Sequence, residues 1–203
     1  ATSLTSEASI ARAREAATRA LALDPGLGEA HGVMGLVKML YDYDWAGAES
    51  AFKLALELSP SSADVHDHYG WLCWSTGRYD EAVELVRRAR ELDPLAHRSD
   101  VAAALLRAGR FEEAVTEARQ SIAFDPNFAR GHSALGWALI ALGEHVEGIA
   151  EMEWAERVSN GDPTFLAQLG EAYATVGRTD EARAVLGRLE TLATRRVVSP
   201  YSF

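Results

Sequence analysis

The chain has 203 residues, 48% of them hydrophobic and 8% aromatic, with six prolines, a balance that favours helices over sheets. The formal net charge of −10 argues against a nucleic-acid backbone as the main partner, because that partner needs a basic face, and it does not favour anionic lipid. The single cysteine, Cys73, excludes an intrachain disulfide and fits a reducing compartment, so we expect a cytoplasmic protein. No apolar run approaches the roughly 18–20 residues of a membrane span, and no membrane partner is expected.

The predicted elements, taken in chain order, are helices arranged as antiparallel pairs within one repeat domain, 1–203. Residues 8–25 are predicted to form a second helix without its first. Five pairs follow at 28–60, 63–94, 97–126, 129–161 and 163–194, and 195–203 is predicted to open a further, truncated repeat. Two antiparallel helices of about 13 residues with two short turns need roughly 34 residues, which is close to the repeat length of this sequence.

Two kinds of residue mark these pairs. Proline ends a second helix, because it cannot donate a backbone N–H and its ring clashes with the preceding turn. The prolines in this position are Pro25, Pro60, Pro94 and Pro126. Small residues are expected where the helices of a pair cross, with Gly70 facing Ala82. The small residues are Gly35, Gly70, Ala104, Gly136 and Gly170 on the first helices, and Ala48, Ala82, Ala114, Gly148 and Ala182 on the second.

These features resemble the tetratricopeptide repeat family, whose pattern has Leu-Gly, then Ala-x3-Phe, then Pro. Residues 30–60 carry the pattern almost completely, with Ala48, Phe52, Ala55 and Pro60. The resemblance covers nearly the whole chain and implies an all-α fold, a right-handed superhelical solenoid of about 11 helices. It also implies a module that binds a protein or peptide in a concave groove lined by the first helices, without a cofactor.

The stretch YDYDWAGAESAF, residues 41–52, is similar to the YDWDW-type turn in repeat segments of bacterial adenylate cyclase, kinase and winged-helix regulator proteins. That resemblance implies a scaffold or regulatory segment of a larger bacterial signalling protein. By their spacing, Tyr41–Trp45 form the turn between the helices of the first pair, with one residue inserted relative to the turn at 77–82. We expect Asp44 to cap the second helix and Tyr41 and Trp45 to pack at its base. A carboxylate–aromatic ligand site is the alternative.

Candidate catalytic chemistry is limited to a few residues. Asp64, Asp67 and His68 fall at i, i+3 and i+4 and could share a helix face, so a metal-dependent enzyme is one alternative. Cys73 lies in mid-helix, where a buried thiol is usually inert, and no nucleophile or phosphate-loop motif occurs. Three histidines share one repeat position, which favours a packing role: His31, His66 and His132. We therefore predict no catalytic residue and no metal site.

The predicted binding surface is the groove formed by the first helices. The expected peptide-binding residues are Met39, Asp64, Asp67, Trp71, Trp74, Arg98, Arg130 and Trp137. Exposed indoles often mark a binding site, but these could also tilt into the core, and the sequence leaves both readings open. Some family members clamp a C-terminal carboxylate with Lys and Asn; here the matching positions hold Gly32, Leu36, Asp67 and Trp71, so that partner is not expected. A structural spacer that contacts its own neighbouring domains is the other alternative.

Both ends of the repeat array are expected to expose apolar side chains, because a repeat unit cannot bury its apolar face alone. At the front this applies to Ile10, Ala13, Ala17 and Leu21, and at the back to Val185, Leu186, Leu189 and Leu192. We expect weak end-to-end self-association, or folding of residues 197–203 back over Leu189 and Leu192.

Overall fold

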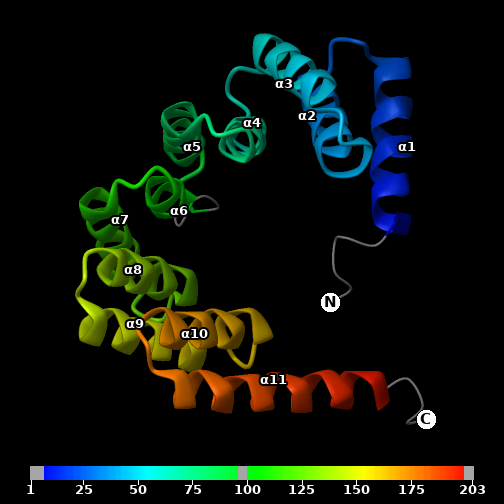
Figure 1. The fold of residues 1–203 in the computed structure, drawn as a ribbon. Coiled ribbons are helices and arrows are strands. Elements are labelled where there is room, and N and C mark those ends of the chain that lie inside the picture. The colour runs from blue at the N-terminus through cyan, green and yellow to red at the C-terminus, as the bar shows by residue number, and fades with distance from the viewer. Residues whose placement is uncertain (1–6, 96–99, 199–203) are drawn as a thin grey trace. The chain divides into compact units, whose positions relative to one another are not determined.

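A computed structural model describes residues 7–95 and 100–198, and every regular element within these ranges is helical (Figure 1). The α-helices are α1 (Glu7–Leu23), α2 (Gly28–Val37), α3 (Trp45–Leu58), α4 (Ala63–Ser75), α5 (Tyr79–Leu92), α6 (Asp100–Arg107), α7 (Phe111–Phe124), α8 (Ala129–Ala141), α9 (His145–Val158), α10 (Pro163–Thr175) and α11 (Thr179–Val198). A π-helical turn, η1 (Lys38–Asp42), continues α2. The predicted all-α architecture of paired helices is confirmed.

The helices group into two compact units, residues 1–104 and 105–203, so each unit is described by itself. In the first unit α1 packs on α2, α2 pairs with α3, and α4 packs on α3 and pairs with α5. In the second unit α7 packs on α8, α8 pairs with α9, and α10 packs on α9 and pairs with α11. First helices also touch one another, α2 with α4 and α8 with α10. One continuous repeat domain over 1–203 stays a prediction.

Prolines follow the ends of the second helices, as predicted. The helices α3, α5 and α7 each end two residues before a proline, at Pro60, Pro94 and Pro126. Thr194 takes the place of this proline in the last pair, and α11 there runs for 20 residues to Val198, compared with 14 residues for α3, α5 and α7. The longer helix is possible because threonine has a backbone N–H and no ring to clash with the preceding turn.

The two helices of a pair cross at positions where both carry small residues. A Cβ added at Gly70 of α4 would lie 2.8 Å from Val86 Cγ2 and 3.4 Å from the carbonyl oxygen of Ala82 in α5. The predicted facing of Gly70 and Ala82 is therefore confirmed. In the second unit, a Cβ added at Gly136 of α8 would lie 2.8 Å from the carbonyl oxygen of Gly148 in α9. At this crossing the two backbones leave no room for a methyl group.

Each unit has its own apolar core. The first is formed by Met39, Ala48, Phe52, Ala55, Val65, Tyr69, Leu72, Cys73 and Ala82. The second is formed by Ile140, Ile149, Met152, Leu166, Leu169, Ala172, Tyr173 and Val185. Burying one large apolar side chain of this kind is worth about 1.5–3 kcal/mol, so these clusters hold the helix pairs together. Burial also raises the pKa of the Cys73 thiol to about 12, which keeps it protonated.

The first helix-to-helix turn absorbs its inserted residue in η1. Gly35 and Tyr43 are one residue further apart than Gly70 and Gly77, the matching residues of the next pair. A π-helical turn closes its hydrogen bonds over one residue more than an α-helical turn. The insertion therefore widens the end of α2 and leaves the following helix in its usual place in the pair.

Candidate functional site

Four of the predicted groove residues lie along one face of α4. Asp64, Asp67, Trp71 and Trp74 are separated by three or four residues, so they follow one stripe of the helix, called the α4 stripe below. The Asp64 side chain is exposed and that of Asp67 is half-buried. The stripe therefore presents two carboxylates in the first half of α4 and two indoles in the second half.

The two indoles of the α4 stripe differ in burial. Trp74 is half-buried and packs against the core of the first unit. Trp71 is 39% exposed. The sequence leaves open whether these indoles line a binding surface or fill the core. In the structure Trp74 contributes to the core, whereas Trp71 presents a large amphipathic ring that a partner can cover.

Met39 is not available to line a groove, and that prediction is wrong. Its side chain is only 2% exposed and belongs to the core of the first unit together with Phe52 and Leu72. The same place in the repeat faces the core in other pairs as well, since Trp74 packs against the first core and Ile140 of α8 is 6% exposed. The unbranched thioether then fills core space.

The predicted groove residues of the second unit lie on α8. Arg130 is exposed in the first turn, and Trp137 is half-buried and packs against the core of that unit. Ser133 Oγ donates a hydrogen bond to Gln168 Oε1 at 2.6 Å, which ties α8 to α10. Arg98 lies outside the described residues. Since α4 and α8 belong to different units, a single groove containing both stays a prediction.

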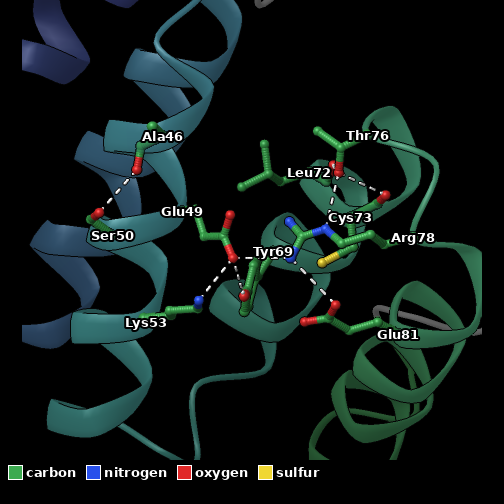
Figure 2. Close-up of polar contacts among 10 residues, drawn as sticks. All are labelled: Ala46, Glu49, Ser50, Lys53, Tyr69, Leu72, Cys73, Thr76, Arg78 and Glu81. Carbon is green, nitrogen blue, oxygen red and sulfur yellow. Dashed lines mark hydrogen bonds and ion pairs between the residues drawn. The ribbon is translucent and has the colours of Figure 1, made fainter.

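A polar junction joins α3 to the turn between α4 and α5 (Figure 2). Arg78 Nη1 donates to Glu49 Oε1 at 3.0 Å and to Glu81 Oε2 at 3.3 Å, and the guanidinium lies 5.9 Å from the Tyr69 ring centroid. Lys53 Nζ and the Tyr69 hydroxyl also reach Glu49 Oε1, at 2.8 Å and 3.3 Å. The Lys53 hydrogen bond, with that of Arg78, holds the pKa of Glu49 below its ordinary value. The junction satisfies its own charges, and we interpret it as structural.

The arginine of this junction recurs just before other second helices. In each case it donates to a glutamate three residues later, in the pairs Arg78–Glu81 at 3.3 Å, Arg110–Glu113 at 2.6 Å and Arg178–Glu181 at 2.8 Å. Arg178 also lies 4.6 Å from the Tyr173 ring centroid, and the Tyr173 hydroxyl donates to Glu153 at 2.8 Å. The sequence signal that could have found this arginine is the repeated Gly-Arg at 77–78, 109–110 and 177–178.

The histidines tie helix starts to the preceding loops, in agreement with their predicted packing role. His31 Nε2 donates to the carbonyl oxygen of Pro25, and His132 Nε2 donates to that of Pro126, both at 2.9 Å. His66 Nδ1 makes a 2.9 Å bond to a carbonyl oxygen at the start of its own helix. These contacts fasten the first turns of α2, α8 and α4 respectively.

The alternative of a metal-dependent enzyme gains no geometric support. Asp64, Asp67 and His68 do not form a metal-binding group, and neither do any other three His, Cys, Asp or Glu side chains in the described part of the chain. Within residues 7–95 and 100–198, none of the helices combines the length and the apolar character needed to cross a bilayer.

The turn between α2 and α3 exposes aromatic rings that were predicted to pack at the base of α3. Asp44 does cap α3, accepting a hydrogen bond from the Gly47 N–H at 2.9 Å, so this prediction is confirmed. Tyr41 and Trp45 are 37% and 43% exposed, however, and Tyr43 is 72% exposed, so packing at the base of α3 is at most partial. Residues 41–45 are called the aromatic turn below.

A hollow of about 440 Å³ lies beside the aromatic turn. It is lined by Ile10, Ala11, Arg14, Glu15, Thr18, Arg19 and Tyr41, so α1 forms most of its wall. Arg14 Nη2 reaches Asp42 Oδ1 at 2.7 Å and ties α1 to the turn.

The second helix of the last pair, α11, exposes a repeat position that is buried in the second helices of the other pairs. Leu186 of α11 matches four earlier residues in the repeat, Phe52, Val86, Ala118 and Met152. Those four are at most 6% exposed, whereas Leu186 is 56% exposed. The expected exposure at this end is therefore observed for Leu186 and Leu192, but it is wrong for Val185, which is 4% exposed and part of the core, and Leu189 packs against that core. At the front the expectation is wrong for Ala17, which is 4% exposed. The helix α11 continues through Val198, and residues 199–203 of the predicted fold-back lie outside the described residues.

Comparison with known proteins identifies the repeat. Family models described as tetratricopeptide repeat match residues 39–105, 102–163 and 163–188. The chain is 41% identical over 96 residues to the TPR repeat-containing thioredoxin TTL4 of Arabidopsis thaliana, and 34% identical over 83 residues to the transcriptional regulator HilA of Salmonella typhimurium. These matches cover 46% and 41% of this chain, but only 14% and 15% of those proteins.

Among solved structures, the chain is similar to PilW, titled a widely conserved type IV pilus biogenesis factor. The TM-score is 0.72 at 20% sequence identity, over 96% of this chain and 88% of that chain, a likeness that concerns the fold alone. The three family matches follow one another from residue 39 to residue 188, across the same helix pairs that the structure shows. The chain belongs to the tetratricopeptide repeat family.

Proposed function

We propose that the chain is a protein–protein interaction module that binds a peptide or partner helix over its first helices, with Trp71 as the main anchor. Tetratricopeptide repeat proteins typically mediate interactions between proteins and are generally scaffolds without catalytic activity. The observation that carries the proposal is the α4 stripe, where a 39% exposed indole follows two carboxylates on one helix face.

The proposed mechanism assigns different roles to the indole and the carboxylates. Tryptophan is a frequent binding hot spot, because its large ring loses water contact without losing many rotamers. Asp64 and Asp67 favour a basic residue beside the anchor and so orient the ligand. Arg130 and Trp137 of the second unit would act on a different part of the ligand, together with Arg98.

We infer further that the module is a scaffold or regulatory segment of a larger protein. The matched parts of TTL4 and HilA are small fractions of those chains, which supports this reading. The HilA match, together with the YDWDW-like turn, supports a bacterial regulator as the parent protein.

A selection from a library of short random peptides displayed on phage tests the binding proposal. Peptides selected on the whole chain are expected to bind Trp71→Ala about 30-fold more weakly, equivalent to about 2 kcal/mol. Trp154→Ala is the matched control, since Trp154 of α9 is also 39% exposed. If no peptide is enriched, the chain is better described as a spacer; if both variants bind the selected peptides equally well, the binding site lies elsewhere and Trp71 is not its anchor.

The exposed face of α11 supports a second, weaker interaction between copies of the chain. Leu186 occupies a position that is otherwise covered, and Leu192 is 37% exposed on the same helix. Covering these side chains in a neighbouring copy removes apolar surface from water. Self-association at this end is therefore proposed to be concentration-dependent.

A further inference from the structure

Tyr43 adopts a backbone conformation that its side chain disfavours. Its φ is 53°, in the left-handed region, where the Cβ of an L-residue approaches the following carbonyl oxygen. The four matching turns all use glycine here, at Gly77, Gly109, Gly143 and Gly177, with φ between 72° and 87°. Because four other turns of this kind are made with glycine, the fold does not need a tyrosine at this position. A bulky residue there calls for another explanation.

Packing does not provide that explanation. The Tyr43 side chain is 72% exposed, so little of the ring is buried against the protein. Trp45, two residues later, is 43% exposed at the first position of α3. Asp42 and Asp44 alternate with these rings in the sequence, so the aromatic turn carries rings and carboxylates on consecutive residues.

Other parts of the chain show which group fits such a surface. The guanidinium groups of Arg157 and Arg178 lie over aromatic rings at 5.1 Å and 4.6 Å, and Arg178 is also hydrogen-bonded to Glu181. Among the described residues, no guanidinium or ammonium group lies over Tyr43 or Trp45. The chain carries a formal charge of −10, which favours a basic partner.

We propose that the aromatic turn binds an arginine-bearing segment of a partner protein. The guanidinium stacks on Tyr43 or Trp45 and pairs with Asp42 or Asp44. Arg14 and Lys38 already contact these carboxylates, at 2.7 Å and 3.3 Å. Both pairs are partly exposed to solvent, and a carboxylate accepts several hydrogen bonds, so an incoming arginine can share or replace them.

This surface is separate from the α4 stripe, and the proposal does not depend on peptide binding there. The hollow beside Tyr41 adjoins this surface, and its wall includes the apolar residues Ile10 and Ala11 together with Arg14 and Arg19. Keeping Tyr43 in place of glycine then exchanges some stability of the fold for a contact with the partner. If the Tyr43 ring has a binding role, replacing it by glycine should stabilise the fold and weaken binding. If its role is structural, the same replacement should destabilise the fold.

The experiment compares pentaarginine with pentalysine, two probes of equal charge, on the whole chain. Binding is followed by the indole N–H resonances of the five tryptophans in two-dimensional NMR. We expect pentaarginine to shift the Trp45 resonance and to bind more tightly than pentalysine. Tyr43→Gly should weaken pentaarginine binding by about 2- to 30-fold and raise the melting temperature. Val146→Ser, at a 90% exposed apolar residue, is the control and should leave pentaarginine binding unchanged.

Two outcomes would overturn the proposal. Equal affinity for the two probes, with Tyr43→Gly unchanged, would show that only net charge attracts them. A lower melting temperature for Tyr43→Gly would show that the ring stabilises the fold and is kept for that reason.

Discussion

Replacing Gly136 by alanine tests how closely α8 and α9 approach. The new Cβ would lie 2.7 Å from Met152 Cγ and 2.8 Å from the carbonyl oxygen of Gly148. The methionine side chain can rotate away, but the backbone oxygen cannot move without separating the helices. We therefore expect Gly136→Ala to lower the free energy of unfolding of the second unit.

The magnitude follows from two opposing contributions. Alanine stabilises a helix by about 1 kcal/mol relative to glycine, and overpacking a closely packed site costs about 1–3 kcal/mol. Gly187 of α11 isolates the first contribution, since a Cβ there meets nothing within 4 Å. Gly187→Ala should therefore be stabilising by about 1 kcal/mol. The difference between the two variants should be about 1–3 kcal/mol, because the helix preference is common to both.

Urea unfolding followed by circular dichroism measures this difference. Both substitutions lie in the second unit, so unfolding of the first unit affects the two variants alike. Gly136→Ala should unfold at a lower urea concentration than wild type, and Gly187→Ala at a higher one. Equal midpoints for the two variants would refute the close backbone crossing, and with it the reason given for small residues at this repeat position.

Three further predictions concern other parts of the chain. The Cys73 thiol, with its pKa raised to about 12 by burial, should react with a thiol reagent near neutral pH only after denaturant is added; rapid reaction of the native protein would contradict its burial. Glu49 has a lowered pKa, chiefly through Lys53, so its contribution to stability is present above pH 4.5 and is lost as the pH falls through the folded-state pKa. The melting temperature of Glu49→Gln should therefore fall below that of wild type near neutral pH, and this gap should narrow in acid. Light scattering should show weak self-association at high concentration, reduced in Leu186→Glu; a strict monomer would exclude association through α11.

Several features of the fold could be predicted from the sequence because their causes are local. A proline ring blocks continuation of the preceding helix, so the residues near Pro60 define a helix end without knowledge of any neighbour. The crossing of Gly70 with Ala82 could also be predicted, since a repeat of about 34 residues places the same small position in each pair. Asp44 was identifiable as a cap from its place just before a helical run.

Side-chain exposure, in contrast, was decided by the tertiary structure. Trp71 and Trp74 look alike in sequence, yet only Trp74 packs against the core of the first unit. Met39 is buried among side chains of α3 and α4, and Tyr43 is exposed in a left-handed turn where other pairs use glycine. The physical reason is that the spacing of residues along a helix depends on the geometry of that helix alone. Burial depends instead on which side chains of other helices reach the same place, and these are set by packing between residues far apart in the chain.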